Sequence, residues 1–115
     1  MKKLAIIGSR SFTNYGLAIQ IFQDYFIDKV DTIVSGGAVG ADAVGRRISK
    51  DYLLKYIEFL PDYKQFGKSA PLKRNIDIVN TADYLLALWD GKSTGTKHTL
   101  GLAKQQKKPT FIVYF

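Results

Sequence analysis

The chain has 115 residues, 46% of them hydrophobic, and its 17 Lys and Arg residues outnumber 10 Asp and Glu residues for a net charge of +7. That length suits a single domain over residues 1–115 and argues against a two-domain enzyme with a separate substrate lobe. The absence of cysteine excludes disulfides, thiolate nucleophiles and Cys-ligated metal centres and is typical of a reducing compartment, so we expect a cytoplasmic protein.

The chain opens with one apolar strand and one amphipathic helix. The run Leu4–Ile7 follows two lysines but is too short for a signal peptide or a membrane span, so no membrane partner is expected. It predicts a buried strand over residues 3–7. A helix follows, capped by Thr13 or Asn14, with an apolar stripe whose members are three or four residues apart. The stripe consists of Ala18, Ile21, Phe22, Tyr25 and Phe26.

A second strand and helix come next, joined by a glycine-rich turn. Residues 31–34 predict a strand, and residues 35–40 read Ser-Gly-Gly-Ala-Val-Gly. The helix after them places Ala41, Val44, Ile48 and Tyr52 on its inner face. A third strand is expected at residues 55–60, although no Gly or Pro separates it from the helix.

The segment from Pro61 to Pro71 is polar and carries lysines, and its length is typical of a binding loop rather than a plain turn. Beyond it, Leu72, Ile76 and Val79 mark a third helix. The remaining elements are a strand over 84–89, a turn over 90–95, a helix over 96–106 and a closing strand over 110–114.

The strands are apolar along their whole length, as expected where helices cover both faces of a parallel sheet. Five strands and four crossover helices predict an α/β fold, a single Rossmann-like three-layer sandwich around a five-stranded parallel sheet. We expect the strand order 3-2-1-4-5, with 2-1-3-4-5 as the alternative. In either order, ligands bind at the carboxyl ends of the strands, where the order reverses.

Three loops at that edge have the composition of an anion site. They cover residues 8–11, 35–42 and 90–96, and each precedes a helix. Glycines let the backbone approach a phosphate, and unpaired N–H groups at a helix N-terminus attract negative charge by about 0.3–1 kcal/mol. Gly36-Gly37-x-x-Gly40 is neither a dinucleotide-binding nor a P-loop fingerprint, so only the convergence of the loops indicates a ligand.

These motifs together carry a family resemblance. Gly8-Ser9-Arg10, the run from Ser35 to Asp42, Arg74-Asn75, and Asp90-Gly91-x-Ser93-x-Gly95-Thr96 resemble the SLOG superfamily, and within it the small YspA-like group, over residues 3–114. Relatives include the Rossmann-like domain of the DNA-processing protein DprA, the LOG phosphoribohydrolases and sensor domains for NAD-derived signals. The resemblance implies a site for a nucleotide or nucleotide derivative.

The resemblance and the loop positions give one set of candidate ligand-binding residues. Each also has a structural interpretation: the glycines as tight turns, the serines as helix caps, Asp42 as a first-turn acid, and Arg74 with Asn75 as a lock between helix and loop. Tyr63, Phe66 and Trp89 are candidates for stacking on a base, although Trp89 also suits the core. The candidate ligand-binding residues are Gly8, Ser9, Arg10, Ser35, Gly36, Gly37, Gly40, Asp42, Arg74, Asn75, Asp90, Ser93, Gly95 and Thr96.

One departure from the LOG pattern bears on catalysis. The position of the LOG catalytic glutamate holds Thr99, whose hydroxyl cannot supply a carboxylate for N-glycosidic cleavage. Asp42 and Asp90 are the nearby carboxylates, and His98, the only histidine, is interpreted as an exposed helix residue. We therefore assign no catalytic residue, and we expect neither a metal nor a cofactor.

Three functions remain open. The first is binding of a nucleotide-like small molecule, such as an ADP-ribose-type or cyclic nucleotide signal, for sensing or sequestration. The second is a nucleotide-processing hydrolase using Asp42, Arg74 or His98. The third is DprA-like single-stranded DNA binding, favoured by the location of the whole charge excess in residues 46–115. We rank nucleic acid below a small molecule, and a homo-oligomer is compatible with so small a sheet.

Overall fold

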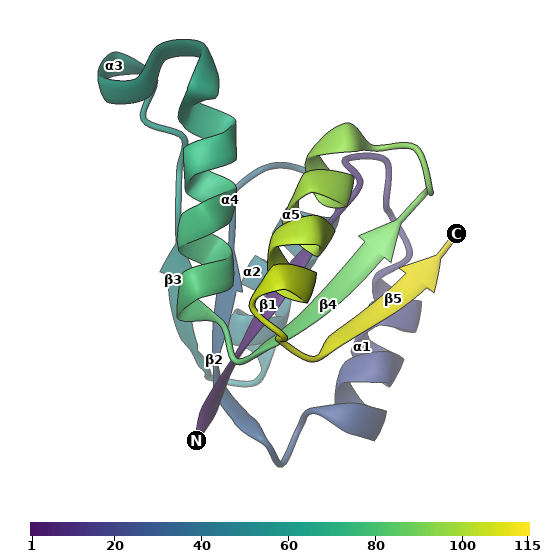
Figure 1. Cartoon of the computed structure of the whole chain (residues 1–115). Coiled ribbons are helices and arrows are strands. Elements are labelled where there is room, and N and C mark those ends of the chain that lie inside the picture. The colour runs from purple at the N-terminus through teal and green to yellow at the C-terminus, as the bar shows by residue number, and fades with distance from the viewer.

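Five parallel strands form one sheet with helices on both faces (Figure 1). The computed structural model describes all of residues 1–115. The sheet order is β3-β2-β1-β4-β5, which confirms the predicted order and the three-layer α/β architecture. The strands are β1 (Lys2–Gly8), β2 (Val30–Ser35), β3 (Lys55–Glu58), β4 (Tyr84–Trp89) and β5 (Thr110–Tyr114).

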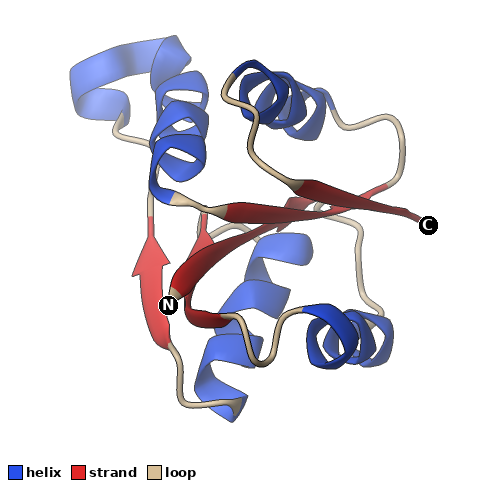
Figure 2. Ribbon diagram, turned by 60° about the horizontal axis from the view of Figure 1, so that its bottom comes forward, coloured by secondary structure: helices blue, strands red, loops and turns tan.

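The four predicted crossover helices are divided equally between the two faces of the sheet (Figure 2). α1 (Tyr15–Tyr25) and α2 (Ala41–Asp51) cover one face, and α4 (Ala70–Thr81) and α5 (Thr94–Gln105) cover the other. None of the helices combines the length and the apolar composition needed to cross a lipid bilayer.

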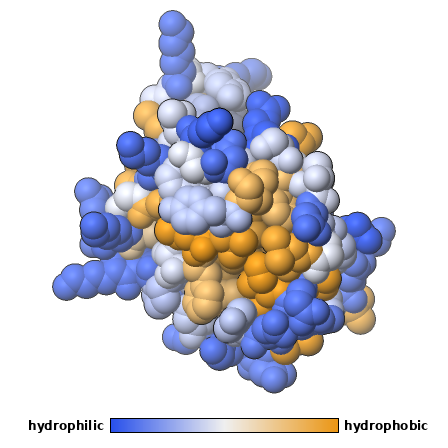
Figure 3. Space-filling model, turned by 90° about the vertical axis from the view of Figure 1, so that its right-hand side faces the viewer, coloured by the Kyte–Doolittle hydropathy of each residue, from blue (hydrophilic) through white to orange (hydrophobic).

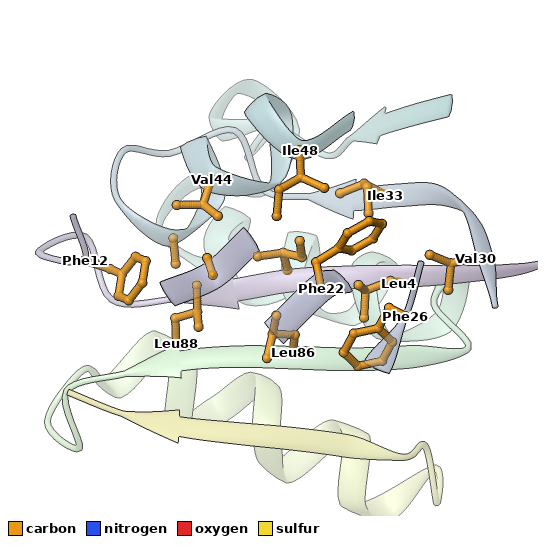
Figure 4. Packing of buried hydrophobic residues seen from close by; sticks show 13 residues of the cluster. Leu4, Phe12, Phe22, Phe26, Val30, Ile33, Val44, Ile48, Leu86 and Leu88 are labelled. Atoms are coloured by element: carbon orange, nitrogen blue, oxygen red, sulfur yellow. The ribbon is translucent and has the colours of Figure 1, made fainter. Parts of the chain in front are cut away.

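The neighbouring strands β1 and β4 contribute to the core on both sides of the sheet, because successive side chains of a strand point to opposite faces. On the α1 and α2 side, Leu4 and Ile6 of β1 pack with Phe22 and Ile48 (Figure 4). On the other side, Ala5 and Ile7 pack with residues of α4 and β4. Burial on both faces explains why β1 and β4 are apolar throughout.

The first helix is capped as expected but its stripe is only partly buried. Asn14, one of the two predicted caps, accepts a hydrogen bond from the Leu17 backbone N–H at 3.1 Å. Phe22 and Phe26 of the predicted stripe are buried, whereas Tyr25 is 51% exposed. The reason is that Tyr25 lies at the rim of the sheet, against Phe111 of the edge strand β5.

The turn between α2 and β3 is made without glycine or proline. Leu53 adopts a φ of 54°, a left-handed conformation that reverses the chain after the helix. β3 ends at Glu58, so the prediction of a strand up to Leu60 was too long. Leu60 is exposed and belongs to the segment that leaves the sheet.

The segment from Pro61 to Pro71 is not a loop throughout. It contains the short helix α3 (Tyr63–Phe66), capped by the Asp62 side chain, and a 3-10 turn over Gly67–Ser69. Pro71 lies in the first turn of α4 rather than at the end of a loop, a position where the missing N–H costs no helical hydrogen bond.

α4 is the predicted third helix, and its buried face includes a polar residue. Asn75, Ile78 and Val79 are buried, whereas Leu72 is 47% exposed and Ile76 is half-buried. Of the three residues that marked this helix in the sequence, Val79 is the buried one, and the polar Asn75 occupies part of the inner face. This buried asparagine becomes important for the site described below.

Truncation of the core should measure how much the α1 packing contributes. Phe22 is fully buried and its ring lies 5.1 Å from that of Tyr52. We expect Phe22→Ala to lower the free energy of unfolding by about 3–5 kcal/mol in urea denaturation, because it removes buried area and leaves a cavity. Leu17→Ala on the outer side of the same helix should change it by less than about 1 kcal/mol; similar losses in both variants would contradict the assignment.

Candidate functional site

A cleft of about 440 Å³ lies at the carboxyl ends of the strands. That volume is within the range of small-molecule sites in proteins. Most of the residues predicted to bind a ligand line it: Gly8, Arg10, Gly36, Gly37, Asp42, Arg74, Asn75, Ser93, Gly95 and Thr96. The fold therefore brings the predicted loops together at one edge.

Four of the predicted residues, Ser9, Ser35, Gly40 and Asp90, do not line the cleft. Ser9 is 2% exposed, and its hydroxyl accepts a hydrogen bond from the Asp90 backbone N–H at 3.0 Å. The Ser9 carbonyl accepts a second one from the Ala41 N–H at 3.2 Å. Ser9 thus joins the loop after β1 to the other two loops that form the site.

Ser35 and Gly40 shape the loop after β2. The Ser35 hydroxyl is buried and donates to the Asp42 carbonyl oxygen at 3.1 Å, which closes the loop onto the first turn of α2. Gly40 has a φ of 73°, and a methyl group there would lie 2.4 Å from the Arg10 carbonyl oxygen. Glycine is therefore required for the close approach of these two loops.

Asp90 organises the loop after β4. One of its carboxylate oxygens accepts hydrogen bonds from the Lys92 and Ser93 backbone N–H groups at 2.8 and 2.9 Å. These two bonds are the main reason why the pKa of Asp90 is lowered. The Ser93 hydroxyl in turn caps α5 by accepting from the Thr96 N–H at 3.4 Å.

Arg74 lies across the cleft from the glycine loop and is bound to it. Its Nη1 donates to the Gly36 carbonyl oxygen at 2.8 Å, and its Nε donates to Asn75 Oδ1 at 3.1 Å. A methyl group on Gly36 would lie 2.5 Å from Arg74 Nη1 and 2.9 Å from Asp42 Oδ2. Gly36 therefore leaves room for this guanidinium, whose remaining N–H donors can bind an anion.

Asn75 connects Arg74 to a residue outside the cleft. The Asn75 side chain is 6% exposed, and its Nδ2 lies 3.2 Å from His98 Nδ1 on α5. With Asn75 Oδ1 accepting from Arg74, Nδ2 is the donor and His98 Nδ1 the acceptor. His98 was predicted to be exposed, but it is half-buried and supports the orientation of Asn75.

Asp42 places a carboxylate beneath the cleft. Burial is the largest cause of its raised pKa, while the Ala38 backbone N–H at 3.2 Å and the Arg74 charge lower the pKa in part. Its side chain is thus a buried acid whose charge opposes the binding of an anion above it. Arg74 offsets that charge without forming a direct ion pair, since no oxygen of an acid lies within 4.0 Å of its guanidinium.

Two helices begin at the cleft. α2 starts after Gly40 with no side-chain cap, and α5 starts after Ser93. Their N-termini direct positive partial charge toward an anion. Thr99, in the second turn of α5, is 3% exposed and its hydroxyl donates to the Gly95 carbonyl at 3.0 Å, a purely local role in the helix.

The apolar side of the cleft was not predicted from the sequence. Tyr63 was predicted only as a possible base-stacking residue; it is 61% exposed and lines the cleft beside Leu60 and Pro61. Its signal was the connection after β3, whose length is typical of a binding segment. The remaining lining residues absent from the prediction are Ile7, Ala38, Pro71, Ile78 and Thr99.

Of the other two candidate stacking residues, neither lines the cleft. The indole Nε1 of Trp89 donates to the Ser93 carbonyl oxygen at 3.1 Å, and its ring contacts Tyr114 with centroids 5.6 Å apart. Phe66 is half-buried at the end of α3. Tyr63 is therefore the aromatic side chain that the fold places at this site.

Residues 1–63, just over half of the chain, match the family of DNA recombination-mediator protein A. No curated protein matches significantly.

Two solved structures share the fold. DNA processing protein A from Helicobacter pylori, described for its single-stranded DNA binding mode, superposes with a TM-score of 0.74 at 24% identity over 96% of this chain. DNA processing protein A from Streptococcus pneumoniae superposes with a TM-score of 0.78 at 17% identity over 97% of this chain. This chain spans 64% of the first and 50% of the second, and at these identities the likeness shows the fold alone.

The charge balance in the cleft can be tested by titration. In Arg74→Gln the nearby positive charge is lost, so we expect the pKa of Asp42, already raised by burial, to rise further. Side-chain carboxyl NMR as a function of pH measures it directly. Arg47→Gln removes an equal charge from a residue paired with Asp51 and should leave Asp42 unchanged; an unchanged pKa in the Arg74 variant would contradict the coupling.

Proposed function

The chain belongs to the family of DNA recombination-mediator protein A, and from this premise we propose that residues 1–115 form one domain that binds single-stranded DNA in the cleft. The proposal reverses the order expected from sequence alone, which ranked nucleic acid third. It is supported by the family match and by the single-stranded DNA binding described for the Helicobacter pylori protein.

The observation that carries the proposal is the meeting of two arginines and two helix N-termini at one cleft. Arg10 is exposed and has no salt bridge, and Arg74 retains free N–H donors beyond its bonds to Gly36 and Asn75. Phosphate oxygens accept hydrogen bonds from arginine and from helix N-termini. A strand lying across the loops would place a phosphate between α2 and α5.

The opposite side of the cleft suits a base. Leu60, Pro61 and Tyr63 form a partly apolar wall next to the phosphate-binding loops. The exposed Tyr63 ring offers a surface on which an unpaired base can stack, a contact worth about 1–3 kcal/mol. Bases of duplex DNA are already stacked, so this arrangement favours a single strand.

Fluorescence anisotropy with labelled oligo-dT tests the proposed site. Arg10→Ala and Arg74→Ala should each weaken binding about tenfold or more, because each removes a charge-assisted hydrogen bond to phosphate. The salt dependence should also fall, since each lost phosphate contact lowers the slope of log K against log salt by about 0.7.

Arg47→Ala is the matched control, because it lowers the net charge equally but lies on the outer side of α2, over Tyr15. If all three variants weaken binding to the same extent, binding is a property of net charge and the cleft is not the site. Circular dichroism establishes that each variant is folded.

Asp42 predicts a specific pH dependence. Its raised pKa means that, as the pH falls through that value, the carboxyl becomes neutral and no longer repels phosphate. Affinity for oligo-dT, whose bases do not titrate in acid, should therefore rise as the pH falls. Asp42→Asn should bind several-fold more tightly at neutral pH and lack this rise; an equal pH profile in both proteins would exclude Asp42 as its source.

A second candidate function is binding of a nucleotide-derived small molecule in the same cleft. The cleft volume of about 440 Å³ and its lining by both the glycine loops and Tyr63 favour it. The resemblance to the SLOG superfamily and its YspA-like group supports the same reading. Hydrolysis of such a ligand is not proposed, because Thr99 stands at the position of the LOG catalytic glutamate and its hydroxyl supplies no carboxylate.

Competition separates the two candidates. ADP-ribose and nucleoside monophosphates are titrated against the oligo-dT complex, and thermal unfolding is followed with each ligand alone. Displacement at micromolar concentration together with a raised melting temperature would favour the small molecule. Oligo-dT binding that no mononucleotide displaces would favour the DNA strand.

A further inference from the structure

A row of three polar side chains, His98, Asn75 and Arg74, connects α5 to the cleft. His98 Nδ1 lies 3.2 Å from Asn75 Nδ2, and Asn75 Oδ1 lies 3.1 Å from Arg74 Nε. Arg74 Nη1 in turn donates to the Gly36 carbonyl oxygen. Arg74 and Asn75 line the cleft, whereas His98 does not. The row therefore joins a residue outside the cleft to a guanidinium inside it.

The side of the molecule at β5 differs from this polar row. Figure 3 shows that side, where apolar side chains gather, and Phe111, Ile112 and Phe115 are exposed. Such side chains offer no hydrogen bond to a guanidinium. The side-chain contacts of Arg74 come instead from α4 and from the loop after β2.

The chemistry of the three side chains fixes the orientation of the Asn75 amide. A guanidinium has N–H donors and no acceptor, so the amide oxygen must face it. The amide nitrogen then faces His98, and it needs an acceptor because Asn75 is 6% exposed and an unpaired buried donor is costly. If the amide turned over, its N–H groups would meet those of Arg74. His98 Nδ1 thus favours the orientation that Arg74 requires.

Asn75 holds the guanidinium without neutralising it. The hydrogen bonds of Arg74 go to the uncharged oxygens of Gly36 and Asn75, and no acid forms a salt bridge with it. Its positive charge is therefore not cancelled by direct contact, and its remaining N–H donors are free for an anion. An aspartate in place of Asn75 would hold the side chain equally well but would remove that advantage.

We propose that His98, acting through Asn75, is a positioning residue for Arg74, and that this positioning strengthens the binding of an oligonucleotide phosphate in the cleft. A bound strand meets Arg74 and not His98, because His98 does not line the cleft. Its contribution is to order the long arginine side chain during folding, so that less entropy is lost on binding. The effect on DNA rests on the proposed function, whereas the effect on Arg74 is measurable without DNA.

Proton–nitrogen NMR of the arginine Nε–H groups tests the positioning in the free protein. The Arg74 signal, assigned by its loss in Arg74→Lys, should be sharp and protected from exchange with water. We expect faster exchange in His98→Leu, which keeps a bulky side chain and removes the acceptor. His98→Asn should restore protection, since an asparagine Oδ1 can accept the same bond from Asn75. His98→Ala repeats the test if leucine disturbs the packing of α5.

Fluorescence anisotropy with labelled oligo-dT measures the consequence for binding. His98→Leu should weaken binding by about two- to tenfold, the effect of one hydrogen bond, and His98→Asn should recover most of that loss. Gln105→Leu is the matched control, because Gln105 lies two turns further along the same face of α5 and has no contact with Asn75. It should bind like the wild type.

A double-mutant cycle separates positioning from a general effect on stability. If His98 acts through Arg74, then Arg74→Ala should weaken binding by a smaller factor in the His98→Leu background than in the wild type. An equal factor in both backgrounds would show that His98 acts independently of Arg74 and would overturn the proposal.

The two measurements also distinguish the failure of this proposal from the failure of the proposed function. Equal protection of the Arg74 Nε–H in the wild type and in His98→Leu, or no recovery in His98→Asn, would overturn the positioning role. If the NMR signals change as expected while the wild-type chain binds no oligo-dT, the positioning role is upheld and DNA binding is the part that fails.

Discussion

The parallel pairing of β1 with both β2 and β4 is the constraint on which the site depends. Because these three strands run in the same direction, the loops that follow them emerge at the same edge of the sheet. β2 and β4 lie on opposite sides of β1, so the chain leaves β1 to one side first and to the other side later, and a cleft remains between the loops at this edge. Ser9 then holds the three loops together through bonds to Asp90 and Ala41. The cleft is thus a consequence of topology, fixed in detail by one buried serine.

Within the cleft, charge is balanced rather than simply positive. The Asp42 carboxylate is buried under the loop after β2, to which Arg74 is hydrogen-bonded. Gly36 lies between the two side chains, and its lack of a side chain leaves room for the carboxylate and the guanidinium. An anion that entered here would meet the Arg74 guanidinium together with the opposing charge of Asp42, which lies near the guanidinium without an ion pair. Such an arrangement holds Arg74 in place before a ligand arrives, which reduces the ordering cost of binding, and it also makes affinity sensitive to the protonation of a single acid.

Much of this arrangement was predictable because the strands are long apolar runs and the loops are marked by glycine. β4 and β5 have the predicted bounds, and the loops after β1, β2 and β4 meet as expected. The failures have specific causes. Leu53 turns the chain with a left-handed φ, a conformation that a leucine in the sequence does not indicate. Asn75 occupies a buried helix position, where apolar spacing would predict a hydrophobic residue. Ser9 and Ser35 were assigned to the ligand, because sequence cannot distinguish a hydroxyl that joins loops from one that faces a cleft.

The two surfaces of the molecule differ in physical character and lie on separate parts of the sheet. The cleft is formed by polar loops at the carboxyl edge, where backbone N–H groups remain for an anion, whereas the β5 edge is apolar and its free backbone groups can be satisfied only by another strand or by water. A charged ligand therefore gains little at β5, whereas the cleft combines hydrogen-bond donors with the partly apolar wall of Leu60, Pro61 and Tyr63. Because β4 lies next to β5 and also leads into the Asp90 loop, the Trp89 and Tyr114 side chains are the contact through which one surface adjoins the other.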